Sequence, residues 1–290
     1  MQTVAAVTMV RDDPFFLATW LRHYGEQFGR ENCYIVNHGR GSQVADMAAG
    51  CNVIGIPGDP HPKFDRKRWQ LLNGIVEGLR QYYRYVIVGD VDELLVLDPE
   101  AGTDLKGWIA QQPARRVLTP LGLEVIHRID LEPDPVTDQI LGPRMHVRPA
   151  PHYSKPCLLS FPTRLSRGGH FSVFPELHTP DELYLLHLKF CDFGVYCETM
   201  DQRNAVTKEI GTSVQDTMIG RHWFETARGE DRDMFESFSQ LDMQEGFDLR
   251  WLRRKMHRSW KPRANSQFFQ FDRPNYRIQY RLPDRFAGVI

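Results

Sequence analysis

The chain of 290 residues is long enough for one large α/β domain or for two small ones. Its 41% hydrophobic and 25% charged residues are ordinary for a globular protein, and a formal charge of −1 gives no basis for a nucleic-acid partner. No apolar run approaches the ~20 residues of a membrane span, and no signal peptide is recognisable. Five cysteines without CxxC spacing indicate reduced thiols, so we predict a cytoplasmic protein.

The first hundred residues alternate between short apolar runs and amphipathic helical patterns. They predict strands at 4–10, 33–36, 52–56 and 86–88, and helices at 14–28, 42–49 and 65–83. The first helix has Asp12 or Asp13 as its cap, Pro14 at its first position and Gly29 as its stop. This alternation predicts an α/β fold, with a mostly parallel central sheet, helices on its faces and right-handed crossovers.

The second half of the chain is less regular. Apolar runs predict strands or strand pieces at 117–119, 121–126, 155–160 and 183–190, and a Pro-rich stretch at 132–151 predicts a long loop over the functional site. Helical patterns return after residue 196, notably at 231–244 and 247–257. We therefore predict a core domain at 1–195 and a helical C-terminal extension at 196–290 that packs on the same domain.

Two aspartates follow the predicted strand at 86–88, which ends on Gly89. Asp90 and Asp92 stand two positions apart, so in an extended chain both carboxylates face one point beyond the carboxyl edge of the sheet. Open α/β sheets bind ligands at that edge. Two hard oxygen donors there suit Mg²⁺ or Mn²⁺, completed by waters and phosphate oxygens.

An acidic pair after a strand also has simpler interpretations, because aspartates form turns and cap helices at such positions. An EF-hand is disfavoured, since Leu95 stands where its loop needs glycine. The apolar residues 94–97 disfavour a phosphoryl-transferring Asp-x-Asp enzyme. The absence of G-x-G-x-x-G after the first strand and of GxxxxGK[ST] disfavours Rossmann dehydrogenases and P-loop enzymes.

Three ordered segments carry a family resemblance: TMVRDDPFFLATWL at 8–21, YIVNHG at 34–39 and VGDVDEL at 88–94. They resemble the opening K-N-E…W-L segment, the second strand with its turn, and the D-x-D-E metal motif of family 2-like and family 92-like GT-A glycosyltransferases. The resemblance covers about residues 3–190 and is weakest at 97–150. Arg11-Asp12-Asp13 replaces the usual Lys-Asn-Glu. Asn37 replaces an acid that often binds the nucleobase of the donor, so the sequence leaves the identity of that nucleobase undetermined.

The resemblance implies a metal-dependent enzyme that moves a sugar from a nucleotide-diphosphate donor, expected to be a UDP-sugar, to a glycan or glycolipid acceptor. It assigns Mn²⁺ or Mg²⁺ to Asp90, Asp92 and His187, although a histidine on an apolar strand is also common in protein cores. The residues expected to bind the donor are Thr8, Arg11, Asn37, Lys67, Asp90 and Lys155. For the three cations in this set, a solvated surface position is the alternative interpretation.

If transfer inverts the anomeric centre, as we expect, a general base must deprotonate the acceptor hydroxyl. The candidates for this base are His170, Glu176, Asp181 and Asp192, with Glu124 as a weaker one. Two other functions use the same carboxylates: a metal-dependent nucleotidyl- or phosphotransferase, and a glycosyltransferase-like module that binds nucleotide or carbohydrate without catalysis. Products separate the two enzymes, because nucleotidyl transfer releases pyrophosphate and glycosyl transfer releases a nucleoside diphosphate.

The stretch 250–263 is locally basic and contains two tryptophans. One interpretation is peripheral contact with anionic membrane lipid, or with an acidic polysaccharide acceptor. The alternative is the charged outer face of a C-terminal helix, with Trp251, Leu252 and Met256 packed inward.

Overall fold

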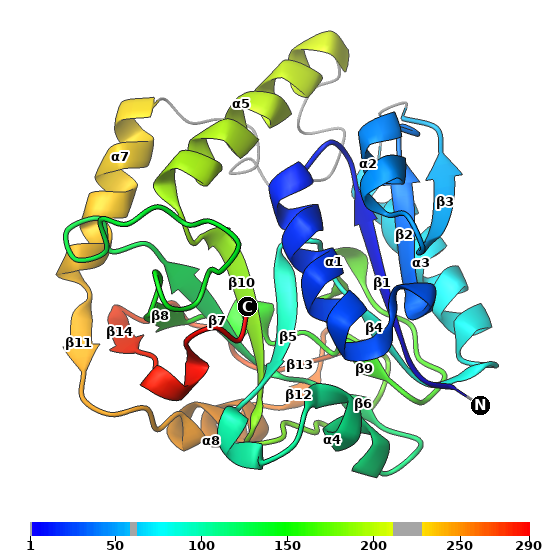
Figure 1. Cartoon of the computed structure of the whole chain (residues 1–290). Helices are drawn as coiled ribbons and strands as arrows, with labels where there is room; N and C mark the ends of the chain where they lie inside the picture. The colour runs from blue at the N-terminus through cyan, green and yellow to red at the C-terminus, as the bar shows by residue number, and fades with distance from the viewer. Residues whose placement is uncertain (1, 59–62, 211–227) are drawn as a thin grey trace.

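Two six-stranded sheets lie side by side in the computed structural model, which describes residues 2–58, 63–210 and 228–290 (Figure 1). The strands of the first sheet, in spatial order, are β3 (Asn52–Ile56), β2 (Cys33–His38), β1 (Gln2–Val10), β4 (Tyr83–Val88), β9 (Leu158–Leu159) and β6 (Val117–Leu118). Those of the second are β11 (Asp242–Gln244), β14 (Ile278–Arg281), β8 (His146–Pro149), β7 (Leu121–Ile126), β10 (Leu183–Phe190) and β5 (Glu93–Leu97). A small hairpin joins β12 (Lys261–Pro262) to β13 (Phe269–Gln270).

Helices flank the sheets. The α-helices of the described part are α1 (Pro14–Phe28), α2 (Ser42–Met47), α3 (Phe64–Leu79), α4 (Leu105–Gln111), α5 (Phe193–Ile210), α7 (Arg228–Glu236) and α8 (Arg250–Arg258). Side chains of both sheets share one apolar core around α1, while a second core lies between the first sheet and α3. In Figure 1 the first sheet lies on the right and the second on the left, with α1 drawn between them.

The predicted β-α-β-α-β-α-β unit is confirmed. Strands β3, β2, β1 and β4 are all parallel, and the fold is α/β. Helix α1 begins at Pro14 with Asp13 as its cap, since the Asp13 carboxylate accepts a hydrogen bond from Phe16 N at 3.4 Å. Gly29 ends the helix with a φ of +87°, a backbone conformation that glycine adopts without a steric penalty.

Strand β5 is the main element that the sequence prediction lacks. Leu94–Leu97 is buried on both faces, so the run shows no alternation, and it follows the turn after β4 directly. It pairs antiparallel with β10 at the edge of the second sheet. A second difference is that α3 ends at Leu79, because the chain already enters β4 at Tyr83 rather than continuing as a helix.

Helix α1 covers the open edge of β5. The Leu95 N–H donates to the Tyr24 hydroxyl at 2.8 Å, and His23 Nε2 donates to the Leu95 carbonyl at 2.9 Å. Both outward-facing backbone groups of Leu95 are thereby paired, which protects an edge strand that would otherwise expose them. The same helix packs on β1 and β2, so it joins the two sheets.

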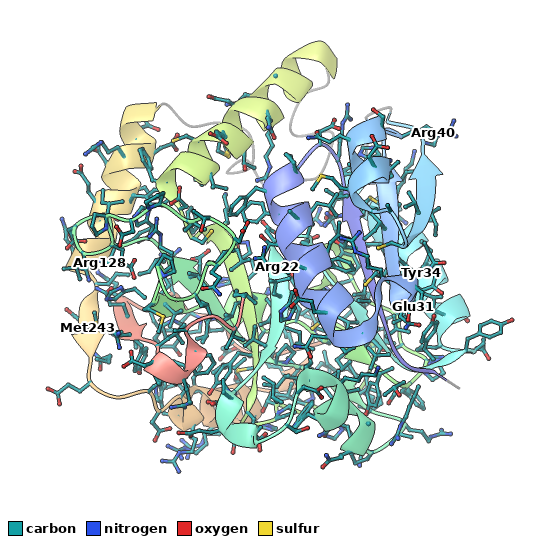
Figure 2. The ribbon with its side chains drawn as sticks, in the orientation of Figure 1. Arg22, Glu31, Tyr34, Arg40, Arg128 and Met243 are labelled. Atoms are coloured by element: carbon teal, nitrogen blue, oxygen red, sulfur yellow. The ribbon has the colours of Figure 1, made fainter. Side chains whose placement is uncertain are left out.

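The predicted C-terminal extension is not purely helical. Strand β14 pairs antiparallel with β8, and β11 pairs with β14, so this region completes the second sheet. Gln279 on β14 is fully buried; its amide donates to the Leu241 carbonyl and its oxygen accepts from Arg128, which is labelled in Figure 2. Strands of three or four residues are too short to show a clear period, which is why the pattern predicted only helices. The boundary near residue 195 stays a prediction.

The basic stretch 250–263 packs as its alternative interpretation states. Leu252 and Met256 of α8 are buried, and Trp251 Nε1 donates to the Tyr280 hydroxyl at 3.2 Å. Trp260 Nε1 donates to the Pro175 carbonyl at 2.7 Å. Membrane or polysaccharide contact through the cationic side chains stays a prediction. None of the helices that the structure describes combines the length and the apolar character needed to cross a bilayer.

Candidate functional site

The turn at residues 89–92 connects the two sheets. The Glu93 N–H donates to the Asp90 carbonyl at 3.1 Å, so the chain reverses between β4 and β5 instead of continuing extended. Thr8 Oγ1 of β1 donates to the Gly89 carbonyl at 3.0 Å and fixes the start of the turn. The chain at Asp90–Asp92 is therefore not extended as expected, and the two carboxylates contact different partners, while their facing one point stays a prediction.

Asp90 lies between two cations at the carboxyl end of β4. Its Oδ1 is 3.0 Å from Arg68 Nη1, and its Oδ2 accepts from Lys155 Nζ at 3.0 Å. Burial would raise the pKa of Asp90, but the guanidinium and the ammonium hold it well below its usual range. The Asp90 side chain keeps 13% of its surface exposed, so solvent reaches this point of the network.

Lys155 also contacts Glu93, whose Oε1 is 2.6 Å from its Nζ. Lys155 is only 2% exposed, and although burial opposes the charge, the two carboxylates raise the pKa of its ammonium above the ordinary value. Burial raises the pKa of Glu93. Glu93 Oε2 is buried and makes no hydrogen bond, which leaves an acceptor for a ligand or water beside this ion pair.

Helix α3 supplies the second cation. Arg68 Nη2 is 3.2 Å from Asp65 Oδ1 one turn earlier, and Arg68 Nε is buried without a hydrogen-bond partner. Lys67, the predicted donor-binding residue of this helix, is exposed. Helical periodicity was the signal that identifies Arg68, because it lies one turn from Asp65 and from the buried Leu72, on the inward face of the helix.

His170 follows a turn that packs against α3. A Cβ on Gly169 would lie 2.4 Å from Trp69 Cη2, so only glycine allows this contact. His170 Nδ1 donates to the His152 carbonyl at 2.9 Å, which leaves its Nε2 as the unprotonated nitrogen. Burial, reinforced by the charge of Lys155, lowers the pKa of His170 to about 3 and keeps the ring neutral.

A second buried polar group surrounds His187 on β10. Its Nδ1 donates to Glu124 Oε1 at 3.0 Å, its Nε2 lies 3.7 Å from Asp92 Oδ2, and its ring stacks on Tyr153 with centroids 3.7 Å apart. The strand register explains the grouping, since His187 lies opposite Glu124 on β7. Glu124 is also paired with Arg148; burial opposes its ionisation, but Arg148 and His187 lower its pKa.

The predicted metal ligands are not gathered around one point. Both oxygens of Asp90 contact cations, whereas His187 directs Nδ1 to Glu124 and Nε2 toward Asp92. Among the residues that the structure describes, no three His, Cys, Asp or Glu side chains form a group that could hold a metal ion. As they lie, Asp90, Asp92 and His187 therefore do not fit a shared Mn²⁺ or Mg²⁺. The metal requirement stays a prediction.

Three predicted donor-binding residues support loops at the same edge. Thr8 is fully buried beneath Gly89. The Asn37 amide donates to the Gly41 carbonyl at 2.8 Å and accepts from the Gly41 N–H at 3.1 Å, so it closes its own turn. Arg11 Nη1 donates to the Gly58 carbonyl at 2.8 Å and remains a quarter exposed. Of the three, Arg11 has the most side-chain surface to offer a ligand.

Three of the predicted bases take part in other contacts. Asp192 Oδ2 accepts from the buried Arg144 at 2.5 Å, and its Oδ1 accepts from Val195 N at 3.1 Å and caps α5. An acid after a strand is a common helix cap, which the sequence alone could not separate from a base. The side chains of Glu176 and Asp181 are 58% and 70% exposed.

Asp13, which is not among the predicted site residues, is a further buried carboxyl group with a cationic partner and a shifted pKa. Asp13, the cap of α1, is buried, and its Oδ2 is 3.9 Å from Arg203 Nη2. Burial raises the pKa of Asp13 to about 6, opposed by Arg203 and reinforced by the negative charge of Asp92. The sequence identified Asp13 only as a cap, because its burial depends on contacts made by α5.

Comparison with known proteins gives remote structural matches alone. No protein-family model matches the chain, and no curated protein sequence does. A cytidylyltransferase from Leptospira borgpetersenii serovar Hardjo-bovis (strain JB197) is 10% identical with a TM-score of 0.25, over 44% of this chain and 55% of that chain. A mannose-1-phosphate geranyltransferase from Thermus thermophilus is 14% identical with a TM-score of 0.31, over 74% and 66%. Each match covers less than two thirds of the length of the matched protein. The α/β assignment therefore rests on the strand pairing described above.

Proposed function

We propose that this protein transfers a sugar from a nucleotide-diphosphate donor, expected to be a UDP-sugar, to a hydroxyl of a glycan or glycolipid, with inversion. The observation that carries the proposal is the buried ion network of Asp90, Lys155, Glu93 and Arg68 at the carboxyl end of β4. Ligands of open α/β sheets bind at that edge. The resemblance of residues 8–21, 34–39 and 88–94 to glycosyltransferases is the second support.

The chemistry asked of the network is stabilisation of a leaving diphosphate. Arg68 and Lys155 provide charge-assisted donors, and the unpaired Arg68 Nε is a further donor for a phosphate oxygen. Asp90 and Glu93 hold the two cations in place before the donor binds. Preorganised charges of this kind need no rearrangement as negative charge develops on the leaving group.

Among the predicted bases, His170 is our candidate for the general base, because the charges of Lys155 and Asp90 both act on its pKa. Its neutral ring presents Nε2 as an acceptor, and in the proposed reaction Nε2 accepts the proton of the acceptor hydroxyl. A pKa of about 3 makes free His170 a weak base. Binding of an anionic donor beside Lys155 would raise that pKa and strengthen the base.

Nucleotidyl transfer is the second candidate function. The convergence of Arg68 and Lys155 on one carboxylate suits a pyrophosphate leaving group as well as a nucleoside diphosphate. Incubation with a nucleotide sugar, and separately with a nucleoside triphosphate and a sugar phosphate, distinguishes the reactions by their products. Nucleoside diphosphate supports glycosyl transfer, and pyrophosphate supports the second candidate.

The proposal is tested first by calorimetric titration with UDP and the other nucleoside diphosphates. We expect binding by the wild type and a weakening of about ten- to a hundredfold in Arg68→Met, the loss of a charge-assisted contact of about 1.5–3 kcal/mol. Lys67→Met is the matched control, since it removes a neighbouring but exposed cation of the same helix. Absence of binding by every nucleotide, or equal loss in both variants, would contradict the proposal.

A further inference from the structure

We infer that Lys155 acts as a tethered cation, occupying the position beside Asp90 that the sequence assigns to a divalent metal. Its ammonium bridges two carboxylates, Asp90 Oδ2 at 3.0 Å and Glu93 Oε1 at 2.6 Å. In the proposed transferase, which this part of the inference rests on, the lysine provides the positive charge that faces the phosphates of the donor. A residue of the chain thus replaces the predicted metal.

The geometry of the ammonium supports this assignment. A lysine ammonium has three N–H donors. Asp90 and Glu93 account for two of them, which leaves the third for a phosphate oxygen. Lys155 is 2% exposed and anchored between β8 and β9, so its charge is fixed in place rather than carried on a mobile side chain.

Charge balance gives a second, independent support. Asp65, Asp90 and Glu93 bring three carboxylates and Arg68 and Lys155 bring two cations in direct contact, and Arg167 Nε, 3.8 Å from Asp65 Oδ2, is the third cation. Buried charges are tolerated when they are paired in this way. A divalent ion on Asp90 would add two positive charges beside an ammonium and a guanidinium, and of the four carboxylate oxygens of Asp90 and Glu93 only Glu93 Oε2 is unpaired.

Removal of the Lys155 ammonium should have a consequence that distinguishes a tethered cation from a bound metal ion. Without the ammonium, Asp90 and Glu93 are close carboxylates in a buried position, with Arg68 as their one remaining cation among the contacts described above. Oxygen donors with uncompensated charge attract divalent cations. Lys155→Met, which keeps the length of the side chain without its charge, should therefore gain affinity for Mn²⁺.

The test is a titration of nucleotide-free protein with Mn²⁺, followed by the electron paramagnetic resonance signal of free Mn²⁺. We expect no stoichiometric binding by the wild type, and at least about tenfold tighter binding by Lys155→Met. Lys261→Met is the control, because Lys261 pairs with the single exposed carboxylate of Asp272. Near-ultraviolet circular dichroism confirms that each variant is folded before the titration.

Stoichiometric Mn²⁺ binding by the wild type, or a folded Lys155→Met with no gain, overturns the inference. If Lys155→Met does not fold, calorimetric titration of the wild type with UDP decides: equal affinity in EDTA and in Mn²⁺ supports the tethered cation, and binding that requires Mn²⁺ overturns it. Failure of UDP to bind under both conditions refutes the proposed function instead, while the Mn²⁺ titration of the wild type still decides the inference.

Discussion

Acidification should destabilise this protein through His23. The histidine lies on the buried face of α1, and its Nε2 donates to the Leu95 carbonyl at the edge of β5. Burial lowers its pKa from 6.5 to about 4, only partly opposed by the hydrogen bond to Leu95. The perturbation we consider is His23→Gln, because a glutamine amide reaches the same carbonyl as a donor but carries no titratable proton.

The sign follows from proton linkage. Between pH 6.5 and about 4, His23 is protonated in the unfolded chain but neutral in the folded protein. The stability that neutral His23 provides is therefore complete above pH 6.5 and is lost as the pH falls through about 4. A difference between 6.5 and about 4 corresponds to about 3 kcal/mol. That is a large share of the ~5–15 kcal/mol that stabilises a typical domain.

Urea unfolding at several pH values between 7.5 and about 4 measures the effect. We expect His23→Gln to resemble the wild type at pH 7.5 and to lose up to about 3 kcal/mol less on acidification. His257→Gln is the matched control, since His257 is exposed on α8 and bonds the Thr179 hydroxyl. Equal acid sensitivity of wild type and His23→Gln would refute the buried, neutral histidine.

Three further outcomes follow from the same structure. Asp13→Asn should have the opposite pH dependence. Because the folded protein raises the pKa of Asp13 from 3.8 to about 6, the stability that protonated Asp13 provides is complete below pH 3.8 and is lost as the pH rises through about 6. In the same urea assay, the variant should therefore be up to about 3 kcal/mol more stable than the wild type above pH 6. Gly169→Ala should cost about 3 kcal/mol by its clash with Trp69, and thermal unfolding should show a smaller loss in Gly102→Ala, which has nearly the same φ (+70° against +68°) in open space. Arg144→Met should cost about 3–5 kcal/mol in urea, since it removes the fully buried cation that pairs with the Asp192 carboxylate; a loss under about 1 kcal/mol would contradict that pairing.

Local signals predicted the first half of the fold. The cap at Asp13, the glycine stop at Gly29 and the stripe through Trp20 and Tyr24 are all set by residues within one helix, and they placed α1 correctly. Alternation of strand and helix then predicted parallel pairing of β1, β2, β3 and β4. This approach missed strand β5, because the fully buried run Leu94–Leu97 shows no alternation of polar and apolar residues. Its partner strand β10 also lies nearly a hundred residues further along the chain.

The sequence predicted where Asp90 lies in the fold but not the contacts of the candidate site. The end of a parallel strand located Asp90, and the family resemblance proposed Lys155, whose ammonium contacts Asp90. The expectation that Asp92 faces the same point assumed an extended chain, and the turn that closes at Glu93 removes that assumption. Helical periodicity places Arg68, but not Lys67, on the inward face of α3, whereas the contact of Arg68 with Asp90 depends on tertiary packing.

We infer a functional rather than a stabilising role for this ion network. Buried ion pairs contribute little to folding, because the cost of removing charges from water nearly cancels their attraction, and apolar residues of similar volume are often as stable. Leu94–Leu97 shows that apolar residues pack well immediately next to the turn. The network at Asp90 and Glu93 includes one unpaired oxygen and leaves Asp90 in contact with solvent. Apolar side chains would join the two sheets with a smaller desolvation cost. The network is instead a sound way to hold two cations ready for an anionic ligand at the edge where open α/β sheets bind theirs.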